Sequence, residues 1–271
     1  MISATMTANE TCHDAPPAAL AANQAGNLST ALFLDVDGTL LDIAEGPSEV
    51  VTPPGLVAAL AQAERKLAGA LALISGRPID ELDGLFEPLR LRASGVHGAQ
   101  MRFDPEGATQ SAPGARELPT ALCSSVTEAL REFPGTYVEN KRFSIAVHYR
   151  RTPSVGPRLH QILKQLIAAP PQVGIELIDA RRAFELKLSN CDKGKAISKF
   201  LGTAPFRGNT PVFVGDDTTD ESGFAAVVAG GGLAYSVGRR RPGVHGVFNA
   251  PQDVRAWLTA FATTDGALAN L

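Results

Sequence analysis

The sequence predicts an α/β fold in which a Rossmann-like core with a parallel sheet is interrupted by an inserted α+β domain. Two observations support this prediction. Apolar strand patterns alternate with helical patterns at both ends of the chain, which is typical of a parallel sheet with crossover helices. Between these two parts the order changes to helix, two strands, helix and two strands, which indicates a separate small unit.

The first alternating part supplies strand ends at which we expect a ligand to bind. Its expected elements are a strand over 31–34, a helix over 54–66, a strand over 70–74, a helix over 79–86 and a strand over 92–97. Ligands of such sheets bind beyond the carboxyl ends of the strands. Asp35, Asp37 and Ser75 all stand at such ends.

The middle part is expected to form the inserted unit. The polar stretch 104–116, rich in Gly and Pro, suggests a linker or a hairpin. It is followed by a helix over 117–133, strands over 136–140 and 143–150, a helix over 158–168, and strands over 174–178 and 183–188. The expected order of the unit is therefore αββαββ.

The alternating pattern then resumes with a helix over 193–201, a strand over 211–214, a helix over 219–228, strands over 232–237 and 244–248, and a helix over 253–262. We therefore predict a disordered tail over 1–28, a core domain built from 29–103 and 189–271, and a cap domain over 104–188.

Composition restricts the class of partner. The chain of 271 residues carries a net charge of −3, which argues against nucleic acid and against a membrane surface. The first 28 residues lack periodicity, and no Lys or Arg precedes Arg65, so neither a secretory signal nor a transit peptide fits. The three cysteines, Cys12, Cys123 and Cys191, show no metal-binding spacing. We expect a cytoplasmic protein with unpaired thiols.

The first chemical motif lies at residues 33–40, Phe-Leu-Asp-Val-Asp-Gly-Thr-Leu. Asp35 and Asp37 are two residues apart, so on an extended backbone their side chains project to the same side. Gly38 permits a sharp turn, and Thr39 offers a hydroxyl and a backbone N–H to a phosphate oxygen. An ordinary Asp-Gly turn after a strand would look the same, so this motif needs matching parts elsewhere.

A second acidic cluster follows the strand 211–214 and reads Gly-Asp-Asp-Thr-Thr-Asp-Glu over 215–221. Favourable placement in the first turn of a helix accounts for Asp220 and Glu221. It does not account for Asp216 and Asp217, which have no basic residue nearby, because adjacent like charges are costly without a cation. The cluster therefore favours a metal ion with oxygen ligands.

Two further motifs offer groups for a phosphate. Ser75, Gly76 and Arg77 end the second expected strand, where a hydroxyl and helix N-terminal amides can bind a phosphate oxygen. Lys193 opens a core helix, where it would neutralise phosphate and nucleophile together. Each motif also has an ordinary explanation, as a helix cap or a solvated helix start.

These four motifs in this order resemble those of the haloacid-dehalogenase-like phosphotransferases. The resemblance implies that Asp35 is the nucleophile that takes the phosphoryl group, and that Asp37 is the general acid and then the base for water. It also implies a phosphate site formed by Thr39, Ser75, Gly76, Arg77 and Lys193, and a Mg²⁺ site formed by Asp35, the Asp37 carbonyl, Asp216 and Asp220.

The inserted unit is expected to select the substrate. A hairpin over 136–150 turning at Lys141 and Arg142 would pair Glu139 with Ser144 and give an apolar and a polar face. The polar face, extended by Glu185 and Lys187, suits a polyhydroxylated ligand, although a solvated face is the common alternative.

The cap motifs Glu139-Asn-Lys141, His148-Tyr-Arg150 and Glu185-Leu-Lys187 resemble those of the trehalose-6-phosphate phosphatases. The resemblance implies sugar contacts from Glu139, Lys141, Arg150, Glu185 and, from the core, His97. It leaves open a phosphatase for sucrose 6-phosphate or mannosyl-phosphoglycerate, a mutase, and a non-catalytic regulatory subunit of a trehalose-synthesising complex. The expected partner is a small sugar phosphate, and the expected state is a monomer.

Overall fold

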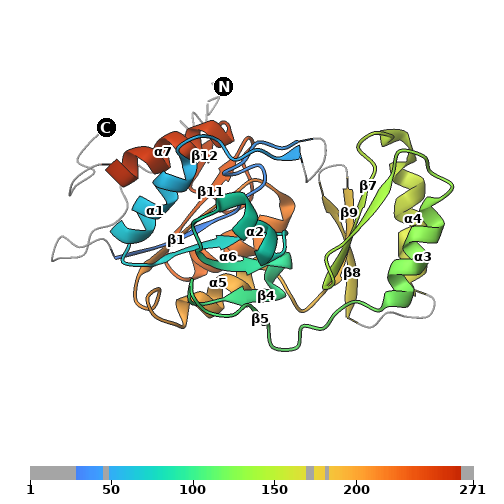
Figure 1. Cartoon of the computed structure of the whole chain (residues 1–271), viewed down its shortest axis with the longest axis horizontal. Coiled ribbons are helices and arrows are strands. Elements are labelled where there is room, and N and C mark those ends of the chain that lie inside the picture. The colour runs from blue at the N-terminus through green and yellow to red at the C-terminus, as the bar shows by residue number, and fades with distance from the viewer. Residues whose placement is uncertain (1–28, 45–48, 169–173, 181–182, 264–271) are drawn as a thin grey trace, which may run out of the picture.

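The computed structural model describes residues 29–44, 49–168, 174–180 and 183–263. These residues form two units side by side, each with its own sheet (Figure 1). The expected tail over 1–28 and Cys12 lie outside the described residues. Within the described part of the chain, no helix is long and apolar enough to cross a membrane.

The larger unit is built on an eight-stranded sheet with the order β12-β11-β10-β1-β2-β3-β4-β5. The strands from β12 to β3 are parallel, and β4 and β5 are added antiparallel at one edge. The bounds are β1 Thr30–Leu34, β2 Leu71–Ile74, β3 Arg92–Gly95, β4 Gln100–Arg102, β5 Gln110–Ser111, β10 Thr210–Gly215, β11 Leu233–Val237 and β12 Gly246–Phe248.

Helices cover this sheet. They are α1 Leu56–Lys66, α2 Ile79–Phe86, α5 Lys193–Leu201, α6 Glu221–Ala229 and α7 Pro251–Thr263. Helices α1 and α7 pack together, as do α5 and α6, on opposite sides of the sheet (Figure 1). Every residue of β1 and β2 is buried, because a parallel sheet covered on both faces has no solvent side.

The register of the central strands brings distant chain segments level. Leu34 of β1 pairs with Val214 of β10 in parallel. The two strands therefore end side by side, and the acidic residues that follow each of them emerge at one edge of the sheet. This alignment places the motifs at 35–39 and 215–221 together.

The smaller unit is the predicted αββαββ unit. Its antiparallel sheet has the order β6-β7-β9-β8, with β6 Tyr137–Asn140, β7 Ser144–His148, β9 Ala183–Leu188 and β8 Ile175–Ala180. Helices α3 Thr120–Leu130 and α4 Gly156–Ala168 pack on one face of it (Figure 1). Apolar side chains of this sheet, among them Ile145, Val147 and Phe184, form a second buried core, which Val96 and Ala99 of the larger unit join.

Three details differ from the sequence-based expectations. Strand β5 lies inside the range expected for the cap, yet it pairs with β4 in the larger sheet. Helix α3 begins at Thr120 rather than at 117, directly after Pro119, which serves as its N-cap residue. The predicted pairing of Glu139 with Ser144 is wrong, because Glu139 pairs with Ala146 and the chain turns through Arg142 at φ 67°.

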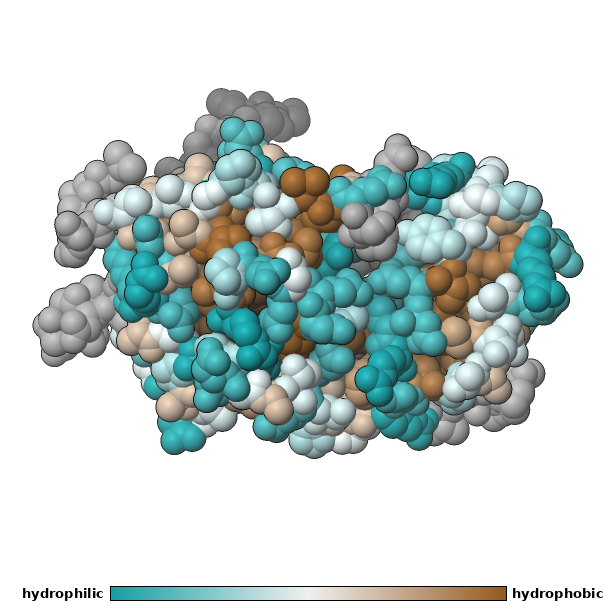
Figure 2. Space-filling model, in the orientation of Figure 1, coloured by the Kyte–Doolittle hydropathy of each residue, from teal (hydrophilic) through white to brown (hydrophobic). Residues whose placement is uncertain are grey.

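The shift in the hairpin register is two residues on β7, so it leaves the two faces unchanged. Glu139 lies opposite Ala146, which lies opposite Glu185 on the next strand. The polar residues therefore still share one face of the small sheet. Hydrophilic side chains gather where the two units meet on the face shown in Figure 2.

A cluster of aromatic rings between α5 and the sheet stabilises the larger unit. Phe200 of α5 lies 6.1 Å from Phe33, 5.1 Å from Phe103 and 5.0 Å from Phe206, measured between ring centroids. All of its side chain is buried.

We expect Phe200→Ala to lower the free energy of unfolding by about 3–5 kcal/mol, because it removes buried ring surface and leaves a cavity. Urea unfolding followed by circular dichroism measures this change. The control Val51→Ala, at a position 77% exposed, should change it by less than about 0.5 kcal/mol. Equal stability of the two variants would contradict the assignment of this ring cluster to the core.

Candidate active site

The edge of the larger sheet carries a buried lysine between two carboxylates. Nζ of Lys193 lies 2.6 Å from Oδ1 of Asp35 and 2.6 Å from Oδ1 of Asp220. Lys193 is 3% exposed and is the first residue of α5, a helix whose N-cap Asp192 accepts a hydrogen bond from the Lys195 amide. Burial lowers the pKa of Lys193, but the ion pairs outweigh burial and raise it above its usual value. Lys193 is therefore a permanent cation at this site.

Asp35 follows β1 directly and is held in an environment that opposes its charge. Burial is the main cause that raises the pKa of Asp35 well above its usual value, and Asp220 and Asp216 raise it further, while Lys193 lowers it. Thr39 donates a hydrogen bond to Oδ2 of Asp35 at 3.2 Å. Additional positive charge beside Asp35 would favour its ionised form.

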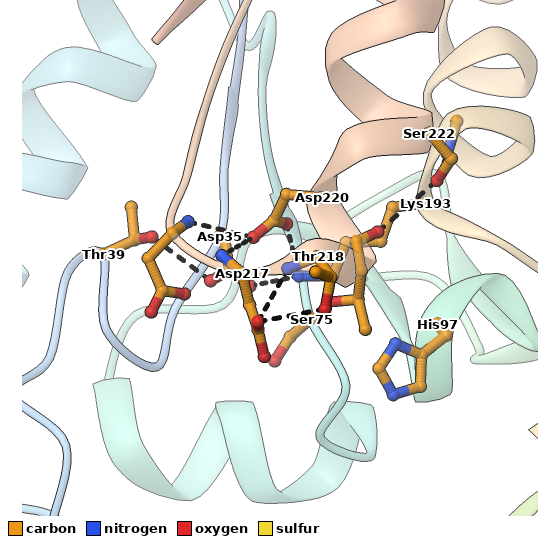
Figure 3. A network of polar contacts seen from close by, with 12 residues as sticks. Asp35, Thr39, Ser75, His97, Lys193, Asp217, Thr218, Asp220 and Ser222 are labelled. Carbon is orange, nitrogen blue, oxygen red and sulfur yellow. Dashed lines mark hydrogen bonds and ion pairs between the residues drawn. The ribbon is translucent and has the colours of Figure 1, made fainter. Parts of the chain in front are cut away.

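Three carboxylates lie close enough together to bind a divalent cation. One oxygen from each of Asp35, Asp216 and Asp220 lies within 4.8 Å of the others. Asp35, Asp217, Asp220 and Lys193 converge in Figure 3 from β1, the segment after β10, and α5. Three negative charges against one lysine leave a net charge of −2, and carboxylate oxygens are preferred ligands of hard divalent cations. The residues fit a divalent metal ion.

Gly38 allows the two acidic segments to approach each other. It has φ +82°, and a Cβ placed on it would lie 2.2 Å from Oδ2 of Asp216. The glycine therefore satisfies both a backbone requirement and a requirement for close approach.

Asp37 has a partner that the sequence did not reveal. Nε and Nη2 of Arg77 each lie 2.7 Å from a different oxygen of Asp37, and Nη1 of Arg77 lies 3.4 Å from Glu81. Arg77, expected to bind phosphate, instead forms a two-pronged ion pair with Asp37. Such a two-pronged pair fixes the orientation of the Asp37 carboxylate.

Ser75 and Gly76 lie directly beside this pair. Oγ of Ser75, which is buried, accepts a hydrogen bond from the Arg77 amide at 3.1 Å. The carbonyl of Gly76 accepts one from Nζ of Lys141 at 3.1 Å. This last bond joins the smaller unit to the larger one.

A second bond between the units joins His97 and Glu185. Nε2 of His97 lies 2.8 Å from Oε2 of Glu185, and Oγ of Ser144 donates to Oε1 at 2.5 Å. Burial would raise the pKa of Glu185, but His97 and Lys141 lower it below its usual value. His97 sits in a left-handed turn at φ 52° with its ring against Gly76, where a Cβ would lie 2.8 Å from it.

Glu139 also has a partner beyond those expected. Nε2 of His148 lies 2.7 Å from Oε2 of Glu139, and the His148 ring stacks on Tyr137 with ring centroids 4.4 Å apart. Nη1 of Arg150 donates to the Ala44 carbonyl of the larger unit at 2.5 Å. The alternation of β7 placed His148 on the polar face, but only the fold shows that it supports Glu139.

These side chains line one cavity of about 200 Å³ between the two units. The predicted site residues that line it are Asp35, Asp37, Gly76, Arg77, His97, Glu139, Lys141, Arg150, Glu185, Lys193 and Asp216. Thr39, Ser75 and Asp220 stand behind this lining and contact it through hydrogen bonds. The structure therefore brings the core and cap residues to one place.

One expectation about the acidic cluster is wrong. Asp216 and Asp217 do have a basic neighbour, Arg241, which is 8% exposed. Its guanidinium donates to the Asp216 carbonyl and lies 3.3 Å from carboxylate oxygens of Asp217 and Glu221. Sequence proximity could not reveal it, because Arg241 comes from the segment after β11.

The fold and this site together define a phosphatase with a mainly parallel core sheet and an inserted α+β unit. Residues 33–241 match the family model described as trehalose-phosphatase. The chain belongs to the trehalose-phosphatase family.

Individual relatives agree with this family. The chain is 37% identical to the "Trehalose-6-phosphate phosphatase" of Escherichia coli over 86% of each chain. It is 37% identical to the "Probable trehalose-phosphate phosphatase" of Sinorhizobium fredii, covering 86% of this chain and 87% of the relative. The solved C-terminal domain of C. albicans trehalose-6-phosphate phosphatase superposes with a TM-score of 0.77 at 19% identity, covering 86% and 91% of the two chains. That structural likeness shows the shared fold.

Gly38→Ala should displace the Asp216 carboxylate and reduce phosphatase activity about 100-fold, since a shift of about 1 Å at reacting groups has that effect. Gly55→Ala is the matched control, because Gly55 has φ +83° and nothing within 4 Å of a Cβ. Both variants should lose about 1–2 kcal/mol of stability from the left-handed backbone. Equal activity of the two variants would show that the close approach at Gly38 is unimportant.

Proposed function

We propose that this protein hydrolyses trehalose 6-phosphate to trehalose and phosphate. One observation supports the proposal above the others: a single cavity is lined on the core side by Asp35, Asp37 and Lys193 and on the cap side by Glu139, Lys141 and Glu185. The core groups suit phosphoryl transfer, and the cap groups suit sugar hydroxyls. The family of the chain supports the same substrate.

In the first step, a carboxylate oxygen of Asp35 attacks phosphorus and the phosphoryl group passes to Asp35, while the sugar oxygen leaves with a proton from Asp37. In the second step, Asp37 takes a proton from water, and that water releases phosphate from Asp35. Lys193 neutralises charge on the phosphate and on Asp35 throughout. Thr39, Ser75 and the segment at Gly76 orient the phosphate oxygens.

The ion pair with Arg77 bears on both roles of Asp37, as general acid in the first step and as base in the second. Asp37 acts as base in the second step, and the pair with Arg77 at 2.7 Å orients its carboxylate for that role. In the first step Asp37 must carry a proton, so its carboxyl has to leave the Arg77 guanidinium. We therefore assign Arg77 to the control of Asp37 rather than to direct phosphate binding.

Mg²⁺ is the proposed cofactor. Asp35, Asp216 and the Asp37 carbonyl would hold it, with Asp220 supporting them, and the ion would offset the negative charge of Asp35 and the phosphate. The raised pKa of Asp35 without a cation supports this assignment.

On the cap side, Glu139, Lys141, Arg150 and Glu185, with His97 from the core, are the proposed contacts of the disaccharide. The carboxylates accept from sugar hydroxyls and Lys and Arg donate to them, so a sugar that lacks the second ring would make fewer of these contacts. The cytoplasmic location and the monomeric state stay predictions.

The test of the activity is phosphate release from trehalose 6-phosphate and glucose 6-phosphate, with Mg²⁺ and with EDTA. We expect kcat/KM to be at least about 100-fold higher for trehalose 6-phosphate, which corresponds to about 2.7 kcal/mol, the worth of one or two hydrogen bonds to charged groups. EDTA and the control variant Asp35→Asn should abolish release. Equal rates on both sugars would refute the role of the cap.

Glu139→Ala should lower kcat/KM for trehalose 6-phosphate about 10- to 100-fold, because it removes a charged hydrogen-bond acceptor. Turnover of para-nitrophenyl phosphate, which has no sugar, should stay near the wild-type rate. Glu128→Ala, at an exposed position on α3, is the matched control and should change neither rate. A parallel loss on both substrates would indicate that Glu139 supports the fold of the cap instead.

A further inference from the structure

We propose that Arg241 is a positioning residue for the metal site: it holds the Asp216 peptide group so that the Asp216 carboxylate is set for the cation. This inference rests on the proposed divalent metal site. Arg241 belongs to a run of three arginines, of which Arg239 and Arg240 are exposed and Arg241 is 8% exposed. The buried member of the run is the one that faces the acidic segment.

Arg241 donates hydrogen bonds to the backbone carbonyl of Asp216. Nε and Nη2 lie 3.3 and 3.0 Å from the Asp216 carbonyl oxygen. The remaining donors face Oδ1 of Asp217 and Oε1 of Glu221, each at 3.3 Å. The guanidinium therefore joins the start of the acidic segment to the first turn of α6.

The same segment is held from the opposite side by Asp220. Its Oδ2 accepts from the amides of Asp216 and Asp217 at 2.9 Å each. The amides of this segment are thus bound by one buried carboxylate and its carbonyl by one buried guanidinium. With the backbone held on both sides, the Asp216 carboxylate lies against Gly38 and within 4.8 Å of a carboxylate oxygen of Asp35.

Charge and position have opposite effects on metal affinity, which makes the inference testable. The positive charge of Arg241 by itself repels a nearby cation, so its removal would strengthen metal binding. Its hold on the peptide group preorganises the ligand, so its removal would weaken binding. Groups that orient metal ligands commonly change metal affinity about 10- to 100-fold.

The test compares Arg241→Met, Arg241→Lys and the matched control Arg239→Met in the full chain. Mg²⁺ binding is measured by calorimetry and free Mn²⁺ by electron paramagnetic resonance, both without substrate. We expect Arg241→Met to weaken binding of both ions about 10-fold, and Arg239→Met to stay within about 2-fold of the wild type. In turnover, the Mg²⁺ concentration for half-maximal rate should rise while kcat at saturating Mg²⁺ stays within about 3-fold.

Arg241→Lys separates the effect of the planar guanidinium from the effect of its charge. It also keeps the test possible if Arg241→Met does not fold. Lysine keeps the charge but lacks the planar fork, so we expect binding about 3- to 10-fold weaker than in the wild type. Unchanged or tighter metal binding in a folded Arg241→Met or Arg241→Lys variant overturns the inference. Failure of the wild type itself to bind Mg²⁺ or Mn²⁺ would instead overturn the proposed metal site.

Discussion

The ion pairs of Lys193 with Asp35 and Asp220 are the interaction on which the site depends. Three carboxylates at the edge of the parallel sheet, two of them buried, would repel one another strongly without a cation. One lysine, 3% exposed, offsets only part of this charge. The remaining negative charge suits the proposed metal ion, and the same lysine is the group that we propose neutralises the phosphate. Lys193 thus reduces the repulsion between the carboxylates in the folded protein and is also the group proposed to neutralise the phosphate.

Backbone features set the positions of the acidic side chains around Lys193. The parallel register of β1 and β10 brings the two acidic segments level, Gly38 lets them approach, and Asp220 and Arg241 hold the peptide groups between them. This arrangement is rigid because each contact involves a strand end or a helix start. By contrast, the smaller unit is tied to the core mainly by side chains, such as Lys141 on the Gly76 carbonyl and His97 on Glu185.

This difference between the two units matches the two tasks proposed for them, phosphoryl transfer in the larger unit and binding of the sugar by the smaller one. Phosphoryl transfer needs fixed positions for few groups, whereas a disaccharide has to enter and leave the cavity between the units. The contacts between the units that line the cavity include polar ones, such as Lys141 on the Gly76 carbonyl and His97 on Glu185, and such contacts can exchange for sugar hydroxyls and water. The pKa of Glu185, held below its usual value by His97 and Lys141, keeps an acceptor ready for such exchange.

The sequence by itself determined the class of fold, the αββαββ order of the insertion and the strand ends that carry Asp35, Ser75 and Asp216, because hydrophobic periodicity and strand-end motifs are local properties. It also determined the faces of the hairpin, which survive a register error of two residues. Only the tertiary structure decided the pairing of Asp37 with Arg77, of Glu139 with His148 and of Asp216 with Arg241. It also decided that β5 joins the larger sheet. Such partners are chosen by chain segments that meet in space, and no periodicity or spacing along the chain records which segments will meet.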